Sequence, residues 1–119
     1  MNLDHLINLI DQMLAATHDA VAFVDGISRD EFLADKKTQQ AVVMSLLIIG
    51  ECATRILDKH AKIAEPAVEI PWRNMRGMRN RIAHGYSEIN LGLVWDTVAD
   101  ELPILAVNLQ KFRAVRQPS

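Results

Sequence analysis

Residues 41–50 read AVVMSLLIIG, and this run decides the fold class because it is the longest strongly apolar stretch in the chain. Asp35 can cap a helix that contains the run and continues to about Lys59. A run of this length is too short to span a bilayer, so we expect a core helix. Its apolar positions recur at the spacing of one buried helix face: Val42, Leu46, Ile49, Ala53, Ile56 and Leu57.

Helical periodicity also covers the chain on the N-terminal side of this run. Roughly residues 2–24 have the apolar spacing of an amphipathic helix, which Asp25-Gly26 would end. Ser28 and Glu31 have the form of a capping box, so a short helix is expected to begin there. Residues 60–70 read as a loop.

The C-terminal part predicts two more helices. Pro71 suits the first turn of a helix that runs to about His84, and Gly85 follows where a left-handed C-cap residue is expected. Asn90 can cap the last helix, in which Pro103 predicts a kink near residues 99–103. No segment alternates with period two. The sequence therefore predicts an all-α fold, a four- to five-helix up-and-down bundle in a single domain, residues 1–119.

Composition indicates an ordinary globular domain, with 50% apolar and 24% charged residues. The single cysteine, Cys52, excludes an intramolecular disulfide and offers no zinc spacing, so no metal site is expected. The N-terminus has no basic segment followed by an apolar stretch, as a signal peptide would. These features favour the cytoplasm and no membrane association.

The net charge of −2 is not the basic excess of a typical nucleic-acid binder, so any anion site must be a local patch. Residues 70–87 form such a patch, because they include no acidic residue. Its basic side chains are Arg73, Arg76, Arg79, Arg81 and His84.

Arg79 has an unexpected position in the helix predicted for residues 71–84. At about 100° per residue it falls between Trp72 and Met75, on the apolar face. A charge on a buried face is costly unless it is paired or faces a cleft. One interpretation is an ion pair with an acid of another helix, such as Glu51, and the other is a functional cleft. The positions alone leave both interpretations open.

The spacing of Arg79 and His84 poses a second question. Five residues correspond to about 140° around a helix, so these side chains would not meet on one face, whereas Asn80 and His84 would. Either the helix ends before His84 and the chain bends back at Gly85, or the two side chains converge across a dimer interface. Gly77 in mid-helix indicates a close backbone approach and favours the dimer.

These residue types fit cleavage of an RNA phosphodiester without a metal ion. A histidine such as His84 can take the proton of a 2′-hydroxyl or give one to the leaving oxygen. An arginine such as Arg79 can hold the phosphate through two parallel hydrogen bonds and stabilise the charge that develops. Asn80 could orient either the histidine or the phosphate.

Residues 70–86, IPWRNMRGMRNRIAHGY, resemble the signature of the HepT-like branch of the HEPN domain superfamily. Residues 49–53 (IGECA), 94–98 (VWDTV) and 102–105 (LPIL) resemble other segments of that family, so the resemblance covers nearly the whole chain. The family's Arg-x4-His-x-Tyr motif is complete in Arg79, His84 and Tyr86. Arg76-Gly77 stands where many relatives have an apolar pair, so Arg76 is either an additional RNA contact or a neutral surface change.

The resemblance implies an RNase toxin of a bacterial or archaeal toxin–antitoxin pair. Such toxins work without metal or cofactor, as homodimers whose two motifs face one cleft. The partner would be a minimal nucleotidyltransferase antitoxin, which can silence the toxin by transferring AMP to the motif tyrosine, here Tyr86. Arg79 and His84 would be catalytic and Asn80 would support them. The other arginines of the patch are expected to contact the RNA, either tRNA or mRNA: Arg73, Arg76 and Arg81.

A different interpretation is a non-catalytic helical module that docks a nucleotidyltransferase and holds a nucleotide, with Arg79 and His84 as phosphate ligands. A structural dimer with a degenerate site is a third. The remaining polar or aromatic positions have simpler expectations. Glu51 is expected to pair with Arg79 or Arg55, and the others are expected to be core, interface or solvent-facing: His5, His18, His60, Cys52, Trp72 and Trp95.

Overall fold

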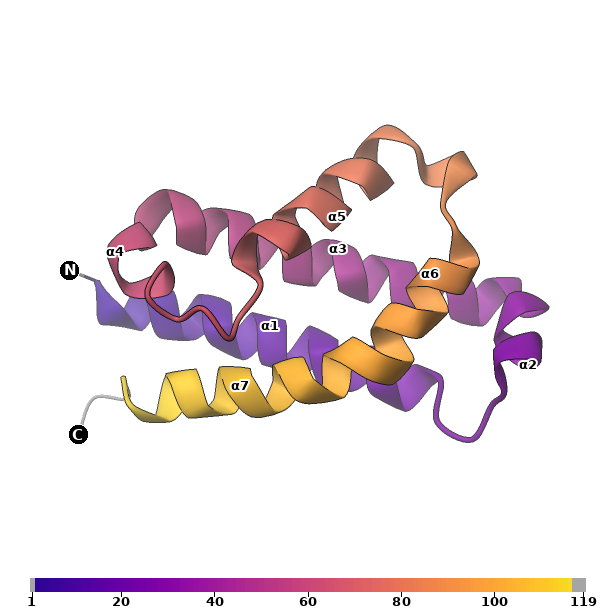
Figure 1. Ribbon diagram of the computed structural model, residues 1–119, viewed down its shortest axis with the longest axis horizontal. Helices are drawn as coiled ribbons and strands as arrows, with labels where there is room; N and C mark the ends of the chain where they lie inside the picture. The colour runs from indigo at the N-terminus through magenta and orange to yellow at the C-terminus, as the bar shows by residue number, and fades with distance from the viewer. Residues whose placement is uncertain (1, 117–119) are drawn as a thin grey trace.

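The computed structural model describes residues 2–116, and within this range every regular element is helical (Figure 1). The long helices are α1 (Leu3–Phe23), α3 (Lys36–Lys59), α5 (Trp72–His84) and α7 (Leu102–Ala114). The shorter ones are α2 (Arg29–Leu33), α4 (Ala61–Ala64) and α6 (Leu91–Asp96). A 3₁₀ turn, η1 (Tyr86–Glu88), and a π-helical segment, η2 (Thr97–Glu101), complete the chain. The predicted all-α class is confirmed.

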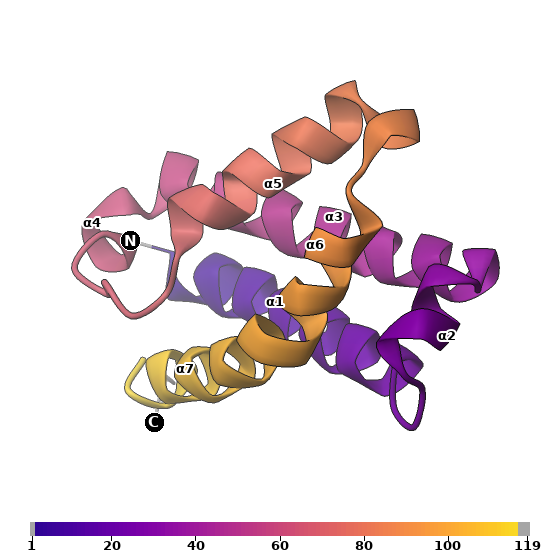
Figure 2. The same ribbon diagram turned by 45° about the vertical axis from the view of Figure 1, so that its right-hand side comes forward.

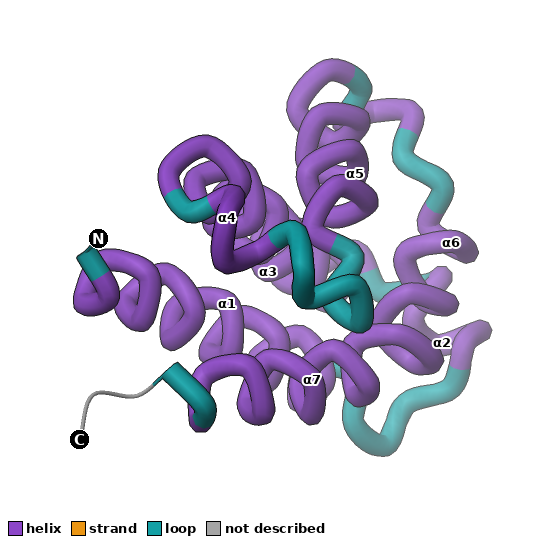
Figure 3. Tube along the Cα trace, turned by 60° about the vertical axis from the view of Figure 1, so that its left-hand side comes forward, coloured by secondary structure: helices purple, strands orange, loops and turns teal. Residues whose placement is uncertain are grey.

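The bundle is built around the antiparallel pair α1 and α3 (Figures 1 and 2). α7 packs on α1, and α5 packs on α3. The start of α5 also meets α7, where the rings of Trp72 and Phe112 are in contact. Short loops join most of the helices (Figure 3). The core is formed by the apolar faces of these helices, and its fully buried members include Leu6, Ile10, Met13, Leu46, Ile49, Ile56 and Leu109.

Three helix starts follow the capping chemistry predicted from the sequence. Ser28 and Glu31 form the capping box: Glu31 N–H donates to Ser28 Oγ at 3.1 Å, and Ser28 N–H donates to Glu31 Oε1 at 3.0 Å. Asp35 accepts from Thr38 N–H at 3.1 Å, and Asn90 accepts from Leu93 N–H at 3.0 Å. Each cap satisfies a backbone donor that the first helical turn leaves unpaired.

Two sequence predictions about loops are wrong. Residues 60–70 are not entirely loop, because α4 forms one helical turn within them. Gly85 ends α5 but has a φ of −148°, so it is not a left-handed cap. Among the described residues only Gly26 has a positive φ, at 77°. Gly85 instead donates its N–H to Arg81 O at 3.0 Å, and the chain continues directly into η1.

The kink predicted near residues 99–103 is confirmed as a change of helix type. η2 takes the chain from α6 to α7 with π-helical hydrogen bonding, and Pro103 stands in the first turn of α7. Proline has no N–H to donate, so the regular ladder must be interrupted just before it. This bend turns α6 away from the line of α7 and toward α5 (Figure 2).

α3 has the length and apolar composition that a membrane-crossing helix would need. In this structure, however, 56% of its most apolar window is buried inside the protein. A central helix that packs on two neighbours can be as long and as apolar as a helix that crosses a membrane. The arrangement of α3 between α1 and α5 accounts for its apolar character.

Candidate functional site

α5 carries the predicted motif on one continuous helix. It runs without a break from Trp72 to His84, so the chain does not bend before the histidine. The first of the two arrangements considered for Arg79 and His84, a bend at Gly85, is therefore wrong. Trp72, Met75 and Ile82 form the buried face, and the indole N–H of Trp72 donates to Ala64 O at 2.9 Å.

Arg79 lies on the flank of α5 that faces α3, directly over Gly50. A Cβ built on Gly50 would overlap the Cβ of Arg79 and would lie 2.7 Å from the carbonyl oxygen of Met75. The two helices can approach this closely only because Gly50 has no side chain. Within one chain the close helix approach therefore lies at Gly50, whereas the approach predicted at Gly77 was one between two subunits. Within this chain a Cβ on Gly77 would meet only the Arg81 guanidinium, at 3.5 Å.

The guanidinium of Arg79 is held from two sides. Its Nη2 pairs with Glu51 Oε2 at 3.1 Å, and its Nη1 donates to Asn80 Oδ1 at 2.7 Å. Its Nε is buried and has no hydrogen-bond partner among the described residues. Glu51 also pairs with Arg55, 3.4 Å from Arg55 Nε to Glu51 Oε1. Glu51 thus pairs with both of the arginines predicted as alternative partners, and the ion pair considered for Arg79 is present.

The other arginines of the patch have different surroundings. Arg73 pairs with Glu65 at 2.9 Å. Arg76 is half-buried and Arg81 is exposed, and neither has an ion-pair partner among residues 2–116. Residues 70–87 contain no acid, yet folding brings Glu51 and Glu65 to two of their arginines. The positive patch is therefore weaker in space than in the sequence.

His84 is the last residue of α5, Tyr86 lies just beyond it, and both are exposed. Tyr86 begins η1, two residues after His84. In the part of the chain that the structure describes, neither side chain makes a hydrogen bond with the protein, so both face solvent. Asn80 contacts Arg79 rather than His84. The structure brings Arg79 and Asn80 together and keeps Arg79 and His84 apart.

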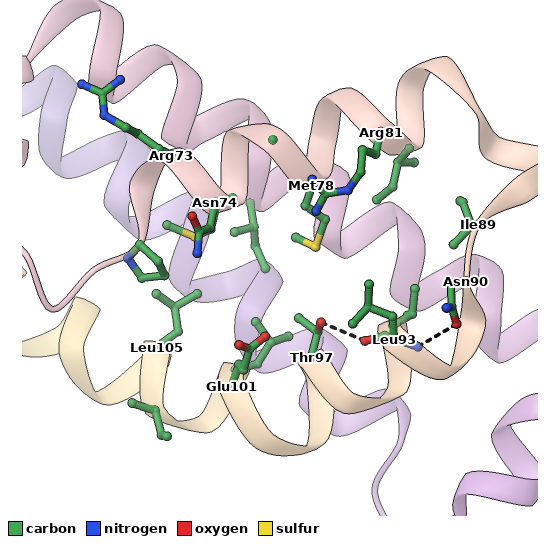
Figure 4. Close-up of a pocket in the computed structure, with 18 of the residues that line it drawn as sticks. Arg73, Asn74, Met78, Arg81, Ile89, Asn90, Leu93, Thr97, Glu101 and Leu105 are labelled. Atoms are coloured by element: carbon green, nitrogen blue, oxygen red, sulfur yellow. Dashed lines mark hydrogen bonds between the residues drawn. The ribbon is translucent and has the colours of Figure 1, made fainter.

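A groove of about 730 Å³ opens between α5 and the α6–η2–α7 wall (Figure 4). Asn74, Met78 and Arg81 point into it from α5, toward Leu93, Thr97 and Glu101 on the opposite wall. None of the motif's Arg, Asn, His or Tyr side chains lines this groove. The motif and the groove therefore lie on different sides of α5.

The remaining candidates have structural roles. Trp72 is buried against Phe112, Trp95 packs on Phe32, and Cys52 is buried, which raises the pKa of its thiol. Among residues 2–116 no three His, Cys, Asp or Glu side chains gather as a metal site would require.

The sequence reasoning missed one pair of histidines at the far end of the bundle. His5 Nδ1 and His60 Nε2 lie 2.8 Å apart and share a hydrogen bond. Burial, and then the charge of His5, lower the pKa of His60. The two residues are 55 positions apart, and no local pattern indicates their contact.

Comparison with known proteins gives a consistent picture. The family model described as "Ribonuclease HepT-like" matches residues 13–112. The protein named "Probable ribonuclease HepT" from Thermococcus cleftensis is 34% identical over 99 residues, which cover 80% of this chain and 87% of that protein. A relative from Caldanaerobacter subterraneus, whose name describes it as an RNase, is 31% identical over 107 residues, which cover 87% of this chain and 89% of the relative.

A second protein with an RNase name, from Methanocaldococcus jannaschii, is 35% identical over 85 residues, 71% of this chain and 68% of the relative. No solved structure matches significantly. The family model covers the motif of α5, the helices before and after it in the chain and most of the core. The chain belongs to the HepT-like ribonuclease family of the HEPN superfamily.

Proposed function

We propose that this protein is a metal-independent endoribonuclease in which Arg79 and His84 are the catalytic residues. One observation carries the proposal: the exposed end of α5 and the turn after it present Arg79, Asn80, His84 and Tyr86 within eight residues of a ribonuclease-family chain. Nothing about the stability of the bundle requires this set. The side chains of His84 and Tyr86 make no hydrogen bond to the described protein and are exposed rather than part of the core.

The chemistry would proceed by attack of a ribose 2′-hydroxyl on the adjacent phosphorus. His84 would take the proton of that hydroxyl or donate one to the departing 5′-oxygen. A bond forms between the 2′-oxygen and phosphorus, and the bond from phosphorus to the 5′-oxygen breaks. One fragment then carries a 2′,3′-cyclic phosphate and the other a 5′-hydroxyl. Arg79 would stabilise the charge that builds on the non-bridging oxygens. Arg73, Arg76 and Arg81 are proposed to hold the rest of the RNA.

The geometry of α5 favours a site shared between two copies of the chain. Arg79 and His84 point about 140° apart on one unbroken helix, so one subunit does not direct both at one phosphate. Met44, Ile48 and Glu51 share one face of α3, and Glu51 contacts Arg79. Met44 and Ile48 are exposed, so an apolar surface borders the motif. We propose that a second copy docks there.

The family membership further supports a role as the toxin of a toxin–antitoxin pair, acting in the cytoplasm. The proposed partner is a nucleotidyltransferase antitoxin that modifies Tyr86, whose side chain is exposed. The tyrosine oxygen would attack the α-phosphate of ATP, lose its proton and release pyrophosphate. The mass of the intact chain, co-expressed with its neighbouring nucleotidyltransferase, tests this step. A gain of one or more AMP units that Tyr86→Phe abolishes supports it, and an unchanged mass contradicts it.

The nuclease proposal is tested with purified, unmodified protein and total or transfer RNA in the presence of EDTA. The wild type is expected to cut, whereas Arg79→Ala and His84→Ala are expected to be inactive. His18→Ala, which removes an exposed histidine of α1, is the matched control and should cut normally. RNA that stays intact with the wild type would contradict the proposal. Binding of RNA or nucleotide without cleavage, lost in Arg79→Ala, would instead favour a docking module.

A further inference from the structure

Glu51 is the only carboxylate in contact with Arg79 among the described residues, and it reaches that arginine from a different helix. We infer that Glu51 is a positioning residue for the proposed nuclease reaction: it fixes the plane of the Arg79 guanidinium so that its outer edge faces the phosphate. This inference rests on the proposed function and adds a residue that lies outside the Arg-x4-His-x-Tyr motif.

The polar contacts of Arg79, an ion pair with Glu51 and a hydrogen bond to Asn80, show how the positioning would work. A guanidinium has five N–H groups, one on Nε and two on each terminal nitrogen. Glu51 engages Nη2, Asn80 engages Nη1, and Nε is buried. At least one N–H on each terminal nitrogen therefore remains for a ligand. Two such N–H groups are what a phosphate needs for a bidentate contact.

The backbone makes this contact rigid. Gly50 lets α5 lie against α3 at Arg79, so the stem of the arginine is confined between the two helices. Glu51, the next residue of α3, is then within reach of the guanidinium. Arg55, one turn further along α3, pairs with the other oxygen of Glu51 and limits its movement. The cluster of Arg55, Glu51 and Arg79 keeps a net positive charge, so it can still attract a phosphate.

A purely structural ion pair is the competing explanation, and the chain contains a matched example. The pair of Arg113 and Asp11 has side chains that are 28% and 47% exposed, against 27% and 45% for Arg79 and Glu51. If Glu51 only stabilised the fold, Glu51→Gln, like Asp11→Asn, would leave RNA cleavage unchanged. Partly exposed ion pairs contribute little to stability, so both variants are expected to fold.

The first experiment measures RNA cleavage by the wild type, Glu51→Gln, Asp11→Asn, Arg79→Ala and the double variant Glu51→Gln/Arg79→Ala. We expect Glu51→Gln to lower kcat by about 10- to 100-fold with little change in KM, since a misplaced catalytic group costs up to about 100-fold. Glu51→Asp should recover part of this loss, and Asp11→Asn should retain full activity. The thermal midpoints of Glu51→Gln and Asp11→Asn should both show a chain that is folded at the assay temperature.

The double variant shows whether Glu51 acts through Arg79. Any activity that Arg79→Ala retains should not fall further when Glu51→Gln is added, because there is no guanidinium left to position. Full activity of Glu51→Gln, or an equal further loss in the Arg79→Ala background, would overturn the inference.

A second experiment does not depend on nuclease activity, so it separates failure of the inference from failure of the proposed function. In ¹⁵N NMR of arginine-labelled protein, a held guanidinium gives separate Nη1 and Nη2 signals because its rotation is slow. We expect separate signals for Arg79 in the wild type and in Asp11→Asn, and averaged signals in Glu51→Gln. Signals that are averaged in the wild type, or still separate in Glu51→Gln, would show that Glu51 does not hold Arg79.

Discussion

Arg79 and His84 lie on the same unbroken helix, five residues apart, and their side chains leave it about 140° from each other. Arg79 turns toward α3, where Glu51 holds it, and His84 faces solvent in the last turn. A single subunit therefore does not direct both side chains at one point. This relationship is the reason for proposing that two copies of the chain complete it together.

The apolar surface beside the motif should control association. Met44→Lys or Ile48→Lys places a charge on the exposed face of α3 and is expected to weaken dimerisation by at least about tenfold. RNA cleavage should fall in parallel, while the helical content stays unchanged. Light scattering at several concentrations, combined with the cleavage assay, makes the test.

Val107→Lys replaces an exposed valine of α7 and is the matched control for that experiment, with mass and activity expected to stay normal. A fully active monomer of the Met44→Lys variant would show that the site is complete within one chain.

Gly50 and Gly77 should respond in opposite ways to the same substitution. Gly50→Ala forces α5 away from α3 and is expected to cost about 1–3 kcal/mol in the free energy of unfolding. Gly77→Ala meets no backbone and is expected to gain about 0.5–1 kcal/mol in the isolated chain, as alanine favours a helix. Urea denaturation measures both values. Equal stability of the two variants would contradict the close approach at Gly50.

The pair of His5 and His60 predicts an acid-sensitive fold. The pKa of His60 in the folded chain lies below its ordinary value of 6.5 because of burial and the charge of His5. The unfolded chain then binds more protons, so stability is fully present above pH 6.5 and is lost as the pH falls toward the folded pKa.

Thermal midpoints between pH 7.5 and 5 should therefore fall less in His60→Gln than in the wild type. His18 lies on an exposed side of α1, so the thermal midpoint of His18→Gln should depend on pH as that of the wild type does. An identical slope in wild type and His60→Gln would contradict the role of this pair.

Tyr86→Phe should separate catalysis from silencing. The substitution removes only the exposed hydroxyl that would accept AMP, and it leaves α5 and η1 unchanged. RNA cleavage is expected to stay within about twofold of the wild type, since phenylalanine keeps the apolar ring. Incubation with the nucleotidyltransferase and ATP should silence the wild type but not the variant. Silencing of both to the same degree would mean that Tyr86 is not the modified residue.

Local sequence patterns predicted the fold well because they report local physics. The spacing of Val42, Leu46 and Ile49 identified α3, and hydrogen-bonding side chains at Ser28, Asp35 and Asn90 marked three helix starts. Gly85 was assigned the wrong conformation because a glycine after a helix permits a positive φ without requiring it.

Contacts between distant residues were harder to predict. The sequence identified Arg79 as misplaced on an apolar face and named Glu51 as a partner, which the structure bears out. It did not predict the close approach of α5 at Gly50, since a mid-helix glycine does not itself show which helix packs against it. The approach predicted at Gly77, between two subunits, stays a prediction. The contact between His5 and His60 depends on how α1 lies along α3, which no short motif encodes.

The central claim is a shared ribonuclease site, and one measurement tests it most directly: RNA cleavage in EDTA by an equal mixture of Arg79→Ala and His84→Ala chains after subunit exchange. Each variant alone should be inactive. In a mixed dimer one site keeps both Arg79 and His84, so random pairing predicts about a quarter of the wild-type activity. A mixture that stays inactive while the wild type cuts RNA would contradict the shared site.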